Sequence, residues 1–156
     1  MPLAVKRVTL WRIDVDNAPG VLAGTLEPLA TAGANLQVLM GYRFPNAPER
    51  AAIEVAPVSG RRTTEAAQRA GLGPSEIPCL LVEADDRPGL GAEIGRACAE
   101  AGINIAFLVA ISLGRRVGAV MGLADEAAAK AAASVLRKVG ARKPAPRKAA
   151  RRARRR

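Results

Sequence analysis

Paired acidic residues stand before Pro-Gly in the stretch DDRPGLGAEIGRACAEAGIN, residues 85–104, where the pattern predicts a strand that leads into a helix. Proline supplies no amide at a helix start, and glycine lets a ligand come close to the main chain. The free amides and the dipole of a helix N-terminus attract a carboxylate, whereas Asp85 and Asp86 attract a cation. A zwitterion, with its carboxylate on the amides and its ammonium on the acids, matches both demands.

The same pattern occurs 69 residues earlier, where residues 16–35 read DNAPGVLAGTLEPLATAGAN. The offset pairs Asp16 with Asp85, Gly20 with Gly89 and Asn35 with Asn104. A chain of 156 residues with such a repeat predicts two similar halves that share a core or an interface. Asp and Asn are also favoured helix caps where nothing binds, so capping alone remains the alternative to a ligand site.

Hydrophobic patterning predicts the order strand, helix, strand, strand, helix in the first half. The expected strands cover residues 7–15, 35–43 and 51–58, and the expected helices run from Pro19 to Gly33 and from Thr63 or Thr64 to Gly71. Pro28 removes a hydrogen bond inside the first of these helices, so we expect a kink or an early end there.

The second half repeats this order. The expected strands cover residues 79–84, 104–113 and 117–124, and the expected helices run from Pro88 to Ala101 and over residues 126–139, the latter capped by Asp125 and ended by Gly140. Residues 75–84 are expected to serve twice, as the last strand of the first half and the first strand of the second. Strands and helices in this order predict an α+β fold.

The composition favours a binding protein over an enzyme. The chain contains no histidine, which excludes a histidine ligand or base, and Cys79 and Cys98 fit no zinc or redox spacing. We expect both cysteines to be buried and unreactive, with no metal and no cofactor. No nucleophile, base and orienting group can be assembled from the motifs, so we expect no catalytic residues.

The basic charge of the chain is concentrated at its end. The net charge is +10, but eleven of the 24 basic residues and no acids lie from Arg137 onward, which leaves 24 − 11 = 13 basic against 14 acidic residues before it. The sequence after Gly140 has two prolines and no large apolar residue, so it predicts a disordered tail. A nucleic acid would be bound through this tail, by Arg147, Lys148, Arg151, Arg152, Arg154, Arg155 and Arg156.

Asp-x-x-Pro-Gly, followed about a dozen residues later by Gly-x-Asn, resembles the ACT domain, a small βαββαβ regulatory module that binds amino acids. The resemblance covers about residues 6–139 and is strongest in DDRPG and GINI. Two copies at this spacing look like the small stand-alone tandem ACT proteins. The resemblance implies two ferredoxin-like repeats side by side, at residues 1–74 and 75–140 before the tail 141–156, in one continuous eight-stranded antiparallel sheet with four helices on one face.

In amino-acid-binding ACT domains such as that of phosphoglycerate dehydrogenase, the ligand lies at an interface between two ACT domains. The resemblance, together with the acids Asp16 and Asp85, implies these ligand-binding residues: Asp16, Asn17, Gly20, Val21, Leu22, Asn35, Asp85, Asp86, Gly89, Leu90, Gly91 and Asn104. The dehydrogenase has a histidine where this chain has Val15 and Ala84, so serine recognition of that kind is not implied.

Two functions therefore compete at this point. In the first, an amino acid binds between the two repeats of a regulatory protein, and a homodimer is compatible with this arrangement. In the second, the basic tail binds nucleic acid without sequence preference while the repeats serve assembly, although the tail could equally be only a solubilising terminus. No run of 18 or more apolar residues and no signal-like N-terminus occur, so we expect a cytoplasmic protein without a membrane partner.

Overall fold

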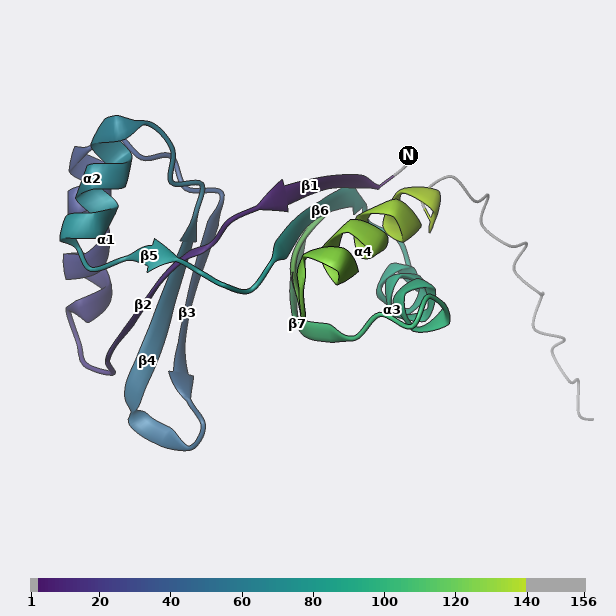
Figure 1. Cartoon of the computed structure of the whole chain (residues 1–156), viewed down its shortest axis with the longest axis horizontal. Helices are drawn as coiled ribbons and strands as arrows, with labels where there is room; N and C mark the ends of the chain where they lie inside the picture. Colours follow the sequence, from purple (N-terminus) through teal and green to yellow (C-terminus); the bar gives the residue numbers. More distant parts are fainter. Residues whose placement is uncertain (1–2, 140–156) are drawn as a thin grey trace, which may run out of the picture.

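Residues 3–139 are described by the computed structural model, which has two halves, each a four-stranded antiparallel sheet with a pair of helices (Figure 1). The helix pairs lie at opposite sides of the molecule, and the two sheets lie between them (Figure 1). This arrangement confirms the predicted α+β class and the βαββαβ pattern.

The first half follows the βαββαβ order along the chain. Its elements are β2 (Trp11–Asp16), α1 (Val21–Thr31), β3 (Val38–Phe44), β4 (Ala47–Ala56), α2 (Arg61–Arg69) and β5 (Gly73–Pro74). The strand order across the sheet is β3-β4-β2-β5, so β3 and the very short β5 are the edges.

The second half takes its last strand from the beginning of the chain. Its elements are β6 (Cys79–Asp85), α3 (Leu90–Glu100), β7 (Ile105–Leu113), β8 (Arg116–Leu123), α4 (Glu126–Val139) and β1 (Ala4–Val8). The strand order is β1-β6-β8-β7, in which β1 occupies the place that β5 occupies in the first sheet.

Residues 3–8 are packed into the second half. Leu3 and Val5 are buried in its core together with Leu80 and Leu136. Arg137 of α4 donates a hydrogen bond to the Val5 carbonyl at 3.1 Å. The second half is therefore incomplete without β1, which the sequence analysis places in the first repeat, residues 1–74.

Two predictions about the strands are wrong for this reason. The single strand expected over residues 7–15 is two strands, because the chain leaves the second sheet after Val8 and enters the first at Trp11. The segment 75–84 is not shared between the halves, because β5 and β6 are separate strands in different sheets. The eight strands of one chain accordingly form two four-stranded sheets and not one continuous sheet.

The helix boundaries follow the sequence with two exceptions. Helix α1 continues past Pro28 to Thr31, so the expected early end does not occur, although Pro28 has no amide to donate to the Gly24 carbonyl. Helix α2 begins after Gly60, whose φ of 80° marks its N-cap, and not at the predicted threonine caps. Asp125 caps α4 as predicted, accepting a hydrogen bond from the Ala128 amide at 2.7 Å.

Small aliphatic side chains fill both cores, as the low aromatic content predicts. In the first half, Leu29 of α1, Ile53 and Val55 of β4 and Ala67 of α2 pack together. A separate cluster joins the halves, which we call the junction cluster: its buried members are Leu10, Val38, Ala56, Cys79 and Val120. None of the helices within residues 3–139 is long and apolar enough to cross a membrane.

Candidate functional site

The first strand-to-helix corner lies between β2 and α1, and its polar side chains already have partners. Gly20 is the N-cap of α1 with φ of 87°. The Asp16 carboxylate is 2.6 Å from Nη1 of Arg50 on β4, and the Asn17 side-chain amide donates to the Pro48 carbonyl at 2.8 Å. The β3–β4 hairpin therefore binds both of the residues that would recognise an ammonium group.

The second corner, between β6 and α3, has the same backbone, with φ of 87° at the N-cap Gly89. Asp85 lies 3.4 Å from Nη1 of Arg116. Asp86 uses its main-chain amide to reach the Arg115 carbonyl at 2.8 Å, and its exposed carboxylate makes no hydrogen bond or ion pair within the described chain. One carboxylate of this corner is thus available to a ligand.

The glycines leave open space at both corners. A methyl group built on Gly20, Gly89 or Gly91 would meet no other heavy atom within 4 Å. The first turn of an α-helix has amides without a carbonyl partner inside the helix, and here they are reached through these glycines. Leu22 is half-exposed beside the first corner, whereas the Val21 side chain is half-buried and that of Leu90 is buried. The Val21 and Leu90 amides already donate to the Ala18 and Arg87 carbonyls, at 3.4 and 3.3 Å, so the later amides of each first turn are the ones open to a ligand.

A charged pair fixes the start of α3. Nη1 and Nη2 of Arg87 donate to Oε1 and Oε2 of Glu93, at 2.6 and 2.5 Å. This bidentate hydrogen bond raises the pKa of Arg87 and lowers the pKa of Glu93. The corresponding positions of the first corner are Ala18 and Gly24, so the pair is specific to the second.

The asparagines lie at the other end of the helices from the corners. Asn35 follows α1 and Asn104 follows α3, each after a glycine with positive φ, and both side chains are exposed. A helix of 11 residues such as α3 separates its two ends by about 16 Å. No half therefore brings its own corner and its own asparagine together.

The two corners also lie far from each other. In the pairing of β1 with β6, Val8 is opposite Cys79, and β6 runs from there to Asp85, whereas β2 leaves the same region for Asp16. The corners are at opposite ends of the molecule (Figure 1). The predicted crevice between the two repeats of one chain is therefore not formed by these residues.

The sheet of the first half carries a polar cluster that the sequence analysis missed. Tyr42 donates a hydrogen bond to Oε2 of Glu54 at 3.0 Å, and Arg12 donates to Asp14 at 2.8 Å while its guanidinium lies 5.7 Å from the centre of the Phe44 ring. The sequence signal for this cluster was the alternation of charged and apolar residues along β2 and β4, which places Arg12 and Asp14 on one face of β2 and sets Glu54 apart from its apolar neighbours on β4.

A groove of about 640 Å³ lies between α1 and α2, lined by Gly24, Pro28, Ala32, Arg62, Glu65 and Arg69 among others. It contains none of the predicted ligand-binding residues. Within residues 3–139, no group of three or more Cys, Asp or Glu residues could hold a metal ion.

Both cysteines are buried and free, as predicted. Burial raises the pKa of the Cys79 thiol to about 11, and the charge of Glu54 adds to the rise. Burial also raises the pKa of Cys98. The predicted nucleic-acid-binding residues 147–156 lie outside the described residues.

The fold is similar to that of several solved proteins. Protein BT0572 from Bacteroides thetaiotaomicron aligns with a TM-score of 0.69 at 15% identity, over 86% of this chain and 89% of that one. The regulatory subunit of aspartate kinase from Thermus thermophilus aligns with a TM-score of 0.60 at 17% identity, over 89% of this chain and 97% of that one.

The match extends to a part of larger enzymes. Escherichia coli aspartokinase III, solved in complex with aspartate and ADP, aligns at 13% identity with a TM-score of 0.56, over 88% of this chain and 32% of the enzyme. No family model and no curated protein sequence matches the chain. These likenesses support an ACT-like fold of the kind that the DDRPG and GINI motifs predict.

Proposed function

We propose that this protein is a regulatory protein that binds an amino acid at its second strand-to-helix corner. The observation that carries the proposal is the free Asp86 carboxylate beside the open glycine turn at Gly89. The helix amides would hold the ligand carboxylate, and Asp86 would hold its ammonium group. The similar folds of an aspartate kinase regulatory subunit and of an aspartokinase solved with aspartate support a regulatory role and an amino-acid ligand.

We further propose that a second copy of the chain completes the site. Asn104 cannot reach the corner of its own half, because α3 lies between them. Strand β7 begins next to Asn104 and ends at Leu113, opposite Arg116, which in turn is opposite Asp85 of the corner. Antiparallel pairing of two β7 strands about a two-fold axis would therefore place Asn104 of one copy near the corner of the other.

The character of β7 supports this pairing. It is an edge strand of the second sheet, and an unpaired edge offers a row of backbone donors and acceptors to another chain. Its apolar side chains are exposed on both faces, with Leu108 at 42%, Val109 at 52%, Ile111 at 60% and Leu113 at 70%. Pairing would build an eight-stranded sheet between two copies, which is the sheet that one chain does not form.

The test is thermal unfolding of the full chain with each of the common amino acids. A ligand at a hundred times its dissociation constant adds about 2.7 kcal/mol to the free energy of unfolding. The variant Ile111→Lys places a charge on the β7 edge and should make the protein monomeric and abolish the ligand effect. A panel in which no amino acid raises the melting temperature contradicts the proposal.

The second candidate function is non-specific nucleic-acid binding through the tail. It is favoured by the run RKAARRARRR, in which seven basic residues are not interrupted by an acid. Full-length protein should then bind duplex DNA at low salt and lose it steeply as salt rises, while a truncation to residues 1–140 should not bind. Equal binding by the truncated and full-length chains would assign the interaction elsewhere.

A further inference from the structure

Within residues 3–139, the chain passes between the two halves only twice, at Thr9–Leu10 and at Ser75–Pro78. The two crossings lie side by side, because the Ser75 amide donates to the Leu10 carbonyl at 2.7 Å. The junction cluster packs around them. A change in the angle between the halves would therefore bend the chain at these crossings and open the junction cluster.

A charged side chain is buried at this junction. The Glu54 side chain on β4 is 1% exposed. Its Oε2 accepts the hydrogen bond from Tyr42, but its Oε1 has no hydrogen-bond partner and lies 4.0 Å from Nη1 of Arg12. The Arg12 guanidinium is directed mainly at Asp14, so the Glu54 carboxylate is only partly compensated for its lost hydration.

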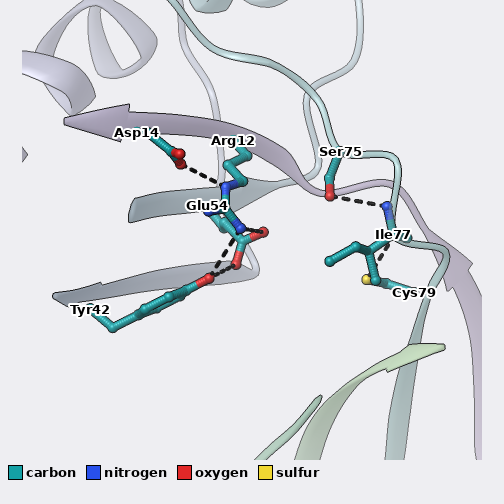
Figure 2. Close-up of polar contacts among 7 residues, drawn as sticks. All are labelled: Arg12, Asp14, Tyr42, Glu54, Ser75, Ile77 and Cys79. Carbon is teal, nitrogen blue, oxygen red and sulfur yellow. Dashed lines mark hydrogen bonds and ion pairs between the residues drawn. The ribbon is translucent and has the colours of Figure 1, made fainter. Parts of the chain in front are cut away.

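The second crossing between the halves lies beside this carboxylate. Figure 2 shows the Glu54 carboxylate between the Arg12 and Tyr42 side chains on one side and the segment Ser75 to Cys79 on the other. The carboxylate acts electrostatically on the Cys79 thiol, which belongs to β6 of the second half. Separation of the halves at the crossings would return water to Oε1.

We propose that the buried charge of Glu54 destabilises the closed arrangement of the two halves and so favours opening of the hinge between them. In the closed arrangement the apolar junction cluster holds the halves together, and the dehydrated carboxylate opposes it. Tyr42 supplies the one hydrogen bond that reduces this opposition. The angle between the halves is thus set by a small difference between apolar contact and carboxylate hydration, and this holds whether or not an amino acid binds.

Cys79 offers a probe of the opening, because it is fully buried in the junction cluster, whereas Cys98, on α3, is buried in the core of the second half. The rate at which a thiol reagent modifies Cys79 in the full chain measures exposure of the junction. The rate at Cys98 measures opening of the second half itself. Mass spectrometry of the two cysteine-containing peptides separates the rates.

Glu54→Gln should slow modification of Cys79 about tenfold, because it removes a buried charge that is incompletely compensated. Tyr42→Phe should speed it, since the carboxylate loses its remaining hydrogen bond. Glu65→Gln, an exposed change on α2, serves as the control and should leave the rate unchanged.

Electrostatics alone predicts the opposite sign for Glu54→Gln, since loss of the nearby negative charge would ease ionisation of Cys79 and speed its modification. A faster or unchanged rate in Glu54→Gln overturns the proposal. So does an unchanged rate in Tyr42→Phe, or a parallel change at Cys98, which would indicate a general change in stability.

Discussion

The first and second strand-to-helix corners share a backbone but differ in what their side chains contact. Gly20 and Gly89 have the same φ of 87° and the same open space above them. In the first corner, Arg50 and the Pro48 carbonyl bind the acid and the amide. In the second, the Asp86 carboxylate has no partner within the described chain, while the Arg87–Glu93 pair fixes the helix start.

The comparison indicates how a duplicated motif can diverge in role. Both copies retain the glycine because the chain must adopt a left-handed conformation at the helix entry, whatever the corner binds. The polar residues are not constrained in this way. In the first corner they contact the β3–β4 hairpin, whereas in the second the Asp86 carboxylate has no partner within the described residues. We therefore expect the two corners to respond differently to matched substitutions.

The largest difference should follow from removal of residues 1–9. Leu3 and Val5 leave the core of the second half, and burial of two such side chains contributes roughly 3–6 kcal/mol. The second corner should lose its support, while the first sheet keeps all of its strands. Hydrogen exchange followed by mass spectrometry should show lost protection in β6, β8 and α4 alone. Equal loss in both halves would contradict the assignment of residues 3–8 to the second half.

Asp86→Ala and Asn17→Ala form a matched pair at the two corners. Asp86→Ala should weaken amino-acid binding by roughly 10- to 100-fold, since a hydrogen bond to a charged group is worth about 1.5–3 kcal/mol, and should leave the melting temperature unchanged. Asn17→Ala should lose about 1 kcal/mol of stability with its bond to Pro48 and retain full affinity. Calorimetric titration and melting curves give both quantities, and weaker binding in Asn17→Ala would assign the ligand to the first corner.

Gly20→Ala and Gly89→Ala should be equal in stability and unequal in binding. Each forces a non-glycine residue into a left-handed conformation at a cost of about 1–2 kcal/mol. Only Gly89→Ala should also reduce affinity, because its methyl group occupies the approach to the α3 amides. Denaturant unfolding measures the first effect and ligand titration the second. Matching losses of affinity in the two variants would indicate that both corners bind.

The smallest effect concerns pH. The Arg87 guanidinium lowers the pKa of Glu93 in the folded state, so the pair stabilises the protein above the unfolded pKa of about 4.3, and this contribution is lost as pH falls through the lower folded value. Melting temperatures of wild type and Glu93→Gln should differ slightly at pH 6 and converge toward pH 3. A gap that widens in acid would contradict this assignment.

The sequence was sufficient to predict elements whose signals are local. The glycines at 33 and 102 that end the helices depend on neighbouring residues, and so does the Asp125 cap. The choice of the neighbouring strand in a sheet, in contrast, depends on residues that are distant in the sequence. Nothing local in residues 4–16 indicates that the chain changes sheets at Thr9–Leu10, because both segments are equally β-like. The prediction of one continuous eight-stranded sheet was therefore wrong for a single chain.

The residues of each corner could be predicted from the sequence, but which of the predicted site residues lie together in space could not. Residues 16–22 and 85–91 are each brought together by one turn, which spacing along the chain can reveal. The placement of Asn35 and Asn104 at the far ends of the helices follows from the length of an α-helix. The Glu54 cluster escaped prediction because the contacts of this glutamate come from β3 and β2, which its own neighbours in the sequence do not indicate.

The central claim is that an amino acid binds at the second corner, between the Asp86–Gly91 segment and Asn104 of a second copy. Backbone amide NMR shifts of the full chain, recorded with and without a saturating amino acid from the melting panel, test it most directly. The account predicts the largest shifts at Gly89, Leu90 and Gly91 and a second group at Asn104. Shifts confined to the first corner or to the groove between α1 and α2 would contradict it.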